Sequence, residues 1–132
     1  MRHSIFQMKG TPKILKIDFE VNKKFDFKKV KSLKLDLDIS HTTKINKEQN
    51  EALVELDIII FPKENESPFT CKTKTIAQFV WGEGTPEETV EKLLKTNAPA
   101  LILSFVRPII SQITTYSGQP TFVIPLLDLS KN

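Results

Sequence analysis

The sequence predicts an α+β domain in which a four-stranded antiparallel sheet is followed by two C-terminal helices that pack on one face of the sheet. Two observations predict this fold class. Up to about residue 81, apolar and polar residues alternate in four separate runs, which is typical of half-buried strands. Beyond that point, apolar residues recur at helical spacing and helix-start signals appear.

The four predicted strands are alternating runs separated by polar connections. The first run, "LKIDFEVN", places four apolar side chains on one side and four polar ones on the other. The polar stretches 41–50 and 62–68 are predicted to connect the later strands. This pattern favours an antiparallel meander with one apolar and one solvated face. The predicted strands cover residues 15–22, 32–40, 52–61 and 69–81.

Signals for a helix start occur twice after the last strand. Thr85 is predicted as an N-cap, Pro86 as the first helical residue and Glu88 as the residue that closes a capping box. Asn97 and Pro99 repeat the order of cap and proline. The sequence therefore predicts a short helix followed by a second, longer one.

The second predicted helix carries more apolar surface than one packing face needs. It can end at Gly118 with a left-handed cap, and Pro108 in its middle should kink it by removing a backbone hydrogen bond. A helix that is apolar over most of its circumference is buried, and a short chain buries one most easily by oligomerising. The residues that we predict at an oligomer interface are Leu101, Ile102, Phe105, Ile109 and Ile113.

The composition is that of an ordinary soluble globular protein that forms one domain over residues 1–132. Hydrophobic residues make up 39% of the chain and charged residues 27%. No apolar run reaches the ~20 residues of a membrane span, and the N-terminus lacks the features of a signal peptide, so we expect no membrane insertion. Cys71 is the only cysteine, which excludes an intrachain disulfide and fits a cytoplasmic location.

The charge is unevenly distributed along the chain. The net charge is +3, but residues 1–47 hold twelve Lys or Arg against five Asp or Glu, whereas residues 48–132 hold seven against eleven. Such asymmetry can mark a nucleic-acid or membrane-surface footprint. The lysines alternate with apolar residues instead of clustering, however, which favours an interpretation as the solvated face of strands.

No combination of residues in the sequence predicts an active site. His3 and His41 are the only histidines, and neither has a cysteine or carboxylate at ligand spacing, so we expect no metal site. Cys71 alternates with apolar neighbours and is predicted to be a small core residue. The "GEG" at 82–84 lacks the glycine spacing and the Lys-Ser/Thr pair of a phosphate-binding loop. We therefore expect neither catalysis nor a cofactor.

The segment "NAPALILSFVRPIISQITTYSGQPTFVIPLLDL" resembles the C-terminal helix and the following segment of the SecB family of export chaperones. "IDFEVN" and "LKLDLDIS" resemble the first and second strands of that family, and the order of four strands and two helices also agrees. The resemblance covers roughly residues 6–129 of the chain. The residues that match the motif in its most specific part are Asn97, Ala98, Pro99, Arg107, Ile110, Ser111, Gly118, Pro120 and Pro125.

This resemblance implies a cytosolic, ATP-independent holdase that assembles as a homotetramer, a dimer of dimers, with unfolded polypeptide clients held in apolar grooves. The excess apolar surface would then be shared between subunit contacts and client contacts, the latter weak individually and multivalent. Five aromatic side chains are candidate client contacts, with core packing as the alternative for each. They are Phe25, Phe27, Trp81, Phe105 and Phe122.

The resemblance also implies a partner from which this sequence departs. In the family, the solvated face of the sheet docks the motor ATPase SecA through acidic residues that flank an apolar one. Here Glu20 falls on one acidic position, whereas Lys16, Thr70 and Lys72 fall on the others. The charge of this face is partly reversed, which opposes docking of SecA.

Three alternatives to a general export chaperone remain open at this stage. The first is a SecB-like chaperone dedicated to one partner, such as those attached to toxin–antitoxin systems. The second is a nucleic-acid-binding module that uses the basic N-terminal third. The third is a structural oligomer without a client site.

Overall fold

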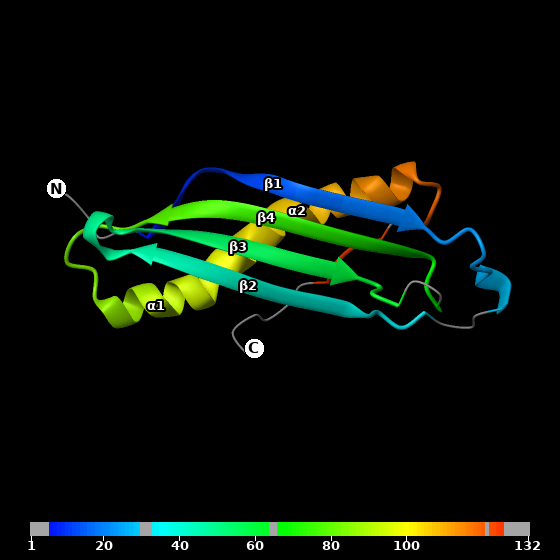
Figure 1. The fold of residues 1–132 in the computed structure, drawn as a ribbon, viewed down its shortest axis with the longest axis horizontal. Coiled ribbons are helices and arrows are strands. Elements are labelled where there is room, and N and C mark those ends of the chain that lie inside the picture. Colours follow the sequence, from blue (N-terminus) through cyan, green and yellow to red (C-terminus); the bar gives the residue numbers. More distant parts are fainter. Residues whose placement is uncertain (1–5, 30–32, 64–65, 121, 126–132) are drawn as a thin grey trace.

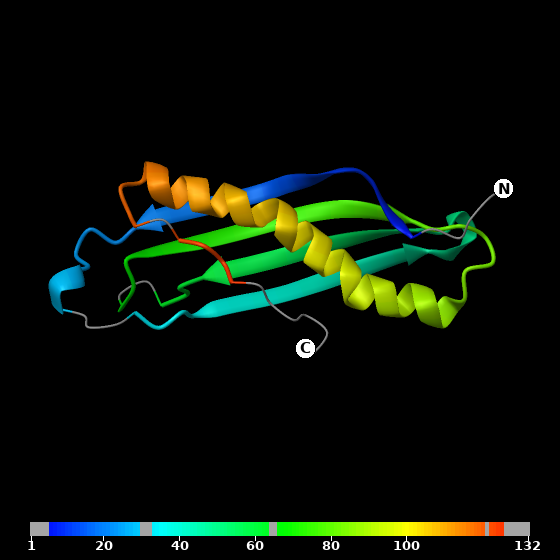
Figure 2. The same cartoon turned by 180° about the vertical axis from the view of Figure 1, so that it is seen from behind.

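The computed structural model describes residues 6–29, 33–63, 66–120 and 122–125. A four-stranded antiparallel sheet forms one layer, and a long helix lies diagonally across one of its faces (Figures 1 and 2). We call the side of the sheet that the helix covers the helix face, and the opposite side the open face. The strands are β1 (Gln7–Val21), β2 (Leu37–Asn46), β3 (Glu51–Ile60) and β4 (Phe69–Val80), and the helices are α1 (Glu87–Lys95) and α2 (Asn97–Tyr116).

The fold class predicted from the sequence is confirmed, but the strand order is not that of a simple meander. The order is β1-β4-β3-β2, so that the first strand pairs with the last. β2, β3 and β4 do form a meander. The connection from β1 to β2 crosses the end of the sheet instead, and it contains a short 3-10 helix, Phe27–Lys29. A connection of this length can reach across two strands, whereas the shorter ones join neighbours.

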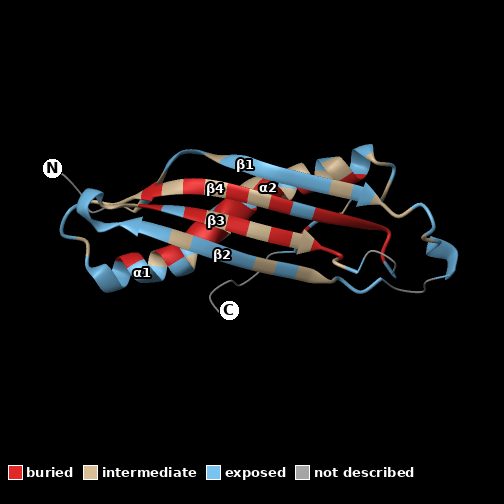
Figure 3. Ribbon diagram, in the orientation of Figure 1, coloured by how far each residue is buried: buried red, intermediate tan, exposed pale blue. Residues whose placement is uncertain are grey.

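The central strands supply the sheet's part of the core. Alternate side chains of β3 are buried on the helix face, and the intervening ones point to the open face (Figure 3). In β4, Cys71, Thr73 and Thr75 lie opposite Ile60, Ile58 and Leu56, and all of these side chains are buried. Both strands are buried on alternate residues, as their sequence pattern predicts. The buried residues of β3 are Ala52, Val54, Leu56, Ile58 and Ile60.

Both edge strands differ from the prediction in their extent. β1 begins at Gln7 and not at residue 15, and its register against β4 shifts twice, between Lys9 and Lys13 and between Ile14 and Lys16. Such bulges break the alternation that the sequence argument relied on. β2 begins at Leu37 and continues through the stretch 41–46 that we predicted as a turn. An edge strand exposed on both faces tolerates this polar sequence, and its β-branched Thr and Ile residues favour the extended backbone.

The two helices follow each other almost without interruption. Only Thr96 separates α1 from α2. The capping box predicted at Thr85 is wrong, because α1 begins at Glu87 and the Thr85 hydroxyl donates a hydrogen bond of 2.7 Å to the Gly82 carbonyl instead. The Asn97 cap is also wrong, since Asn97 is itself helical.

The C-terminal end of α2 follows the prediction. Gly118 has a φ of +81°, and the amide of Gln119 donates to the carbonyl of Thr114 at 3.2 Å. A left-handed residue directly after the helix allows this bond, and glycine adopts that conformation without a steric penalty.

α2 buries one face on the sheet and continues through Pro108. Pro108 is exposed, on the side of the helix away from the sheet. The carbonyl of Ser104, which loses its helical donor, belongs to another exposed residue, so water can satisfy it. A proline on the outer side favours curvature toward the sheet. The residues of α2 that are buried are Ala98, Pro99, Ile102, Leu103, Val106, Ile110 and Thr114.

By length and composition alone, Glu87–Tyr116 would be long and apolar enough to span a membrane. Its 30 residues exceed the apolar runs that the sequence suggested, because α1 and α2 join. This property is weak evidence for a membrane span, because the core helix of a folded domain also has it. Here one face of the helix packs on the sheet.

We predict that Ile110→Ala lowers the free energy of unfolding by about 2–5 kcal/mol, because it leaves a cavity between α2 and the sheet. Urea denaturation at fixed protein concentration measures this change. The control Gln112→Ala, at an exposed position of the same helix, should change it by less than about 0.5 kcal/mol. Similar losses for both variants would contradict the described packing.

Candidate functional site

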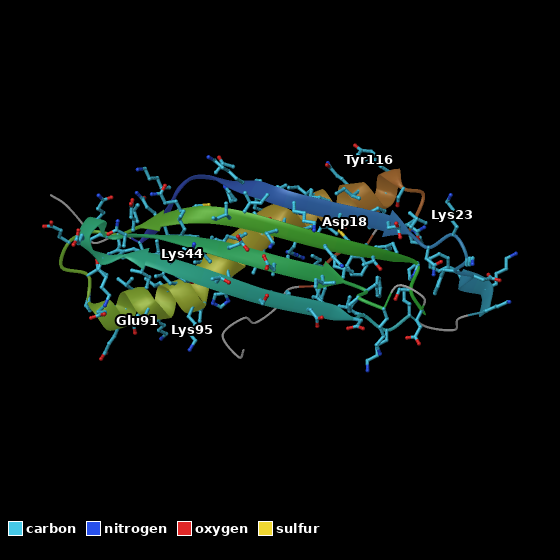
Figure 4. The ribbon with its side chains drawn as sticks, viewed as in Figure 1. Asp18, Lys23, Lys44, Glu91, Lys95 and Tyr116 are labelled. Carbon is cyan, nitrogen blue, oxygen red and sulfur yellow. The ribbon has the colours of Figure 1, made fainter. Side chains whose placement is uncertain are left out.

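The side chains predicted to contact clients lie in four separate places. Phe25 and Phe27 lie at one end of the molecule, in the connection between β1 and β2, near Lys23 in Figure 4. Trp81 lies at the opposite end, beside α1, the helix on which Figure 4 labels Glu91. Phe105 lies on α2. Phe122, just after that helix, packs near the end of the sheet where β4 begins.

Phe25, which is half-buried, and Phe27, which is exposed, form an aromatic pair. Their rings meet edge to face, with centroids 4.9 Å apart, and Phe27 is 46% exposed. The turn that holds them is fixed by the Asp26 carboxylate, which accepts a hydrogen bond of 2.9 Å from the amide of Lys28. Lysines precede and follow the pair in the sequence. An aromatic pair of this kind offers apolar contact area at little entropic cost.

Trp81 lines a pocket of about 170 Å³ between the β2–β3 turn and α1. Its indole stacks on Phe6, with ring centroids 6.1 Å apart. Lys47 closes one side through an ion pair of 2.6 Å with Glu87, and this pairing raises the pKa of Lys47 and lowers the pKa of Glu87. Both partners are exposed, so the pair adds little to stability.

Phe122 is part of an aromatic cluster inside the domain. Its ring centroid lies 5.7 Å from that of Phe61 and 5.8 Å from that of Phe69, and Phe69 in turn contacts Phe19. Phe122 is half-buried. It therefore stabilises the segment after α2, and a client could reach only its remaining exposed part.

The outer side of α2 carries the surplus apolar surface that the sequence indicated. Leu101 is 46% exposed, and Phe105, Ile109 and Ile113 are half-buried. Leu101, Phe105 and Ile109 are four residues apart and line one stripe along the helix, which we call the outer stripe. Ile102, however, is 0% exposed and belongs to the protomer's own core, so its assignment to a subunit interface was wrong.

Sequence reasoning missed a second apolar area, on β1. Ile14 and Ile17 lie opposite Thr75 and Thr73 in the register, which places them on the helix face, yet both are more than a third exposed. Leu15, in the bulge next to them, is 54% exposed. Alternation predicts that such residues are buried. Only the three-dimensional structure shows that the helix covers the sheet incompletely along this edge.

The four positions compared with the SecA-binding face lie on or near β1 and β4. Lys16 lies opposite Lys74, Glu20 opposite Thr70, and Asp18 opposite Lys72. Lys16, Glu20 and Lys72 are exposed on the open face. Thr70 is buried, and its hydroxyl donates a hydrogen bond of 2.9 Å to the Phe61 carbonyl. The register places Thr70 on the open face beside Glu20, but its side chain offers almost no surface to a partner.

The remaining reactive side chains lie apart from one another. Within the described part of the chain, no group of three or more His, Cys, Asp or Glu residues converges on a common point. Cys71 is fully buried, and this burial raises the pKa of its thiol to about 11, with a smaller contribution from the Asp18 carboxylate. His3 lies outside the described residues.

A sheet is covered on one side by a long helix, and apolar side chains are left exposed along both, so the domain offers apolar surface for contact with other polypeptides. The sequence profile of the preprotein translocase subunit SecB matches residues 3–131. The chain therefore belongs to the SecB family.

The solved structures that are similar to this chain include the following two. One is a SecB-like chaperone of Mycobacterium tuberculosis, Rv1957, in complex with a ChAD peptide from the antitoxin HigA1; it is 15% identical, with a TM-score of 0.68 over 92% of this chain and 87% of that one. The other is a protein of unknown function from Streptococcus agalactiae, 10% identical, with a TM-score of 0.52 over 94% of this chain and 99% of that one. No curated protein sequence matches the chain.

We predict that Cys71 reacts with a thiol reagent at pH 8 at least about 100-fold more slowly in the folded protein than in denaturant. A pKa of about 11 in place of 9.0 lowers the thiolate fraction by roughly this factor, and burial restricts access further. The raised pKa also stabilises the folded state below about pH 9, and this contribution is lost as the pH rises through about 11. Equal reaction rates in both states would show that the thiol is accessible.

Proposed function

We propose that this protein is an ATP-independent holdase chaperone that binds unfolded polypeptides in the cytoplasm. The observation that carries the proposal is the pair of exposed apolar areas: the outer stripe of α2, and Ile14, Leu15 and Ile17 on β1. Because unfolded chains expose scattered apolar side chains, a broad apolar surface can hold them through many weak contacts. Membership of the SecB family supports this proposal.

Part of this apolar surface is proposed to join subunits into a homotetramer. The outer stripe runs along a helix that already buries its other face, so a second helix can pack on it without disturbing the core. Phe25 and Phe27 lie at the far end of the domain and remain available to a client. The two roles are thereby assigned to different elements of the same protomer.

A second candidate function is that of a chaperone dedicated to one partner. The structure of the SecB-like chaperone from Mycobacterium tuberculosis with an antitoxin peptide favours it, since that protein shares this fold. A dedicated chaperone would bind one partner tightly and leave unrelated unfolded proteins unprotected. We find no comparable observation in favour of a nucleic-acid-binding module.

The proposal does not include delivery of clients to SecA through the open face. Lys16 and Lys72 are exposed there, where the family uses acidic residues. Lys16 also lies opposite Lys74, which adds a further positive charge next to it. The SecA surface that normally meets an acidic face would meet two lysines here, and their positive charges oppose its docking.

We predict that the wild-type protein suppresses aggregation of an unrelated protein diluted from denaturant, and that Phe25→Ala/Phe27→Ala weakens this effect several-fold. The substitution removes the exposed aromatic contacts without touching the core. Light scattering at increasing ratios of chaperone to client measures the effect. The control Lys24→Ala/Lys28→Ala changes the neighbouring charges and should retain more activity than the aromatic variant.

Failure of the wild-type protein to protect several unrelated clients would reject the general holdase. Tight binding of a single partner under the same conditions would then establish the dedicated function. Equal activity of the wild type and the aromatic variant would leave the holdase in place but remove Phe25 and Phe27 from its client site.

We further predict that Leu101→Asp/Phe105→Asp reduces the solution mass from a tetramer to a smaller species, because two carboxylates in an apolar interface cannot be desolvated cheaply. Light scattering after gel filtration measures this mass. The control Lys92→Asp/Lys95→Asp adds carboxylates to exposed positions of α1 and should leave the mass unchanged. A tetramer that survives the first change, or a monomeric wild type, would exclude the outer stripe as the interface.

A further inference from the structure

The segment after α2 packs between that helix and the sheet, and we call the surface of α2 and the sheet that it covers the groove. Residues 122–125, which we call the strap, run along the helix face beside α2, toward the end of β3 (Figure 2). Their side chains alternate in exposure: Phe122 is half-buried and Ile124 is 0% exposed, whereas Val123 is 58% exposed and Pro125 is also exposed. This is the pattern of an extended peptide seated in a groove with two apolar pockets.

Side chains of α2 hold the strap by its main chain. Arg107 Nε donates to the carbonyl of Ile124 at 2.8 Å, and Ser111 Oγ donates to the carbonyl of Phe122 at 2.9 Å. The amide of Phe122 donates to Thr114 Oγ1 at 3.0 Å. Arg107, Ser111 and Thr114 are four and three residues apart, so they lie along one side of α2. This side faces the extended backbone of the strap. Main-chain hydrogen bonds are available to any polypeptide sequence.

Apolar side chains form the rest of the groove. Phe122 packs against the rings of Phe61 and Phe69, and Ile124 belongs to the hydrophobic core. The groove therefore selects for apolar residues two positions apart and reads the backbone between them. An unfolded chain presents such stretches often, so it offers the same chemistry as the strap.

We propose that this groove is a binding site for extended apolar polypeptide, and that the strap is an internal competitor that a client must displace. The inference rests on the holdase function proposed above. Because the strap is covalently attached, it competes with a client at an effective concentration in the millimolar range. It therefore keeps weakly binding, mostly polar segments of a client out of the groove. Only a client with well-placed apolar residues, bound also elsewhere on the protomer, removes it. Selectivity for unfolded chains then follows from the competition itself.

Hydrogen exchange tests this proposal in the wild-type protein without substitutions. The probe is the amide of Phe122, measured with and without a saturating, permanently unfolded client such as reduced and carboxymethylated α-lactalbumin. We expect the protection of this amide to fall at least about 10-fold when the client binds, while the amides of Val106 and Ile110 within α2 keep theirs. Protection of Phe122 that stays unchanged or rises in the complex would overturn the proposal.

A labelled peptide that copies residues 119–127 provides a second, independent test. Phe122→Ser/Ile124→Ser in the full chain vacates the groove, so the peptide should bind this variant at least about 10-fold more tightly than the wild type. The matched control Val123→Ser/Pro125→Ser changes the two outward positions and should bind like the wild type. Adding Arg107→Ala/Ser111→Ala to the vacated variant should abolish the gain. Equal peptide affinity for the vacated variant and the wild type would overturn the proposal.

These outcomes separate this inference from the holdase proposal. A protein that suppresses aggregation while Phe122 remains protected is a holdase whose strap is a fixed structural element. A protein that binds no unfolded client fails as a holdase, whereas the peptide experiment still decides whether the groove accepts an extended chain.

Discussion

The packing of α2 on the two central strands is the interaction on which the rest of the structure depends. Ile102, Val106 and Ile110 are fully or almost fully buried on the helix face, over strands whose inward side chains are equally buried. A sheet with one apolar face needs another element to bury that face, and most of the stability of a helix in a protein comes from packing its apolar side. Because this contact uses only one side of α2 and only part of the sheet, it leaves apolar surface exposed on both elements.

The position of the exposed surface follows from the geometry of that contact. The helix crosses the sheet diagonally and leaves part of β1 uncovered, so Ile14 and Ile17 stay accessible on the helix face (Figures 2 and 3). On the other side of α2, the strap fills the space with Phe122 and Ile124. The two sides of one helix thus differ: one side is open to partners, and the other is closed by the chain itself.

The sequence predicts the parts of this protein that depend on local periodicity. Alternation located β3 and β4 to within one residue of their observed bounds, and Gly118 marked the end of α2. It failed where long-range pairing decides, as in the position of β1 beside β4 and the extension of β2 through a polar stretch. For the site, helical spacing located the outer stripe but could not tell that Ile102 faces the sheet, because an apolar helix gives no polar side to orient it. The sequence also did not predict the strap, because its hydrogen bonds come from polar residues of α2 that are far from it in sequence, such as Arg107.

The strand order also explains the uneven charge of the chain. The basic first third forms both outer strands of the sheet, β1 and β2, while the less basic remainder forms the centre and the helix. Lys9, Lys13 and Lys16 lie along one rim, and Lys44 lies on the other. Lysines on outer strands discourage the pairing of the edge strand of one molecule with that of another. Such pairing is the first step of fibril growth. The lysines of the two outer strands thereby protect the sheet from being extended by the strands of another chain.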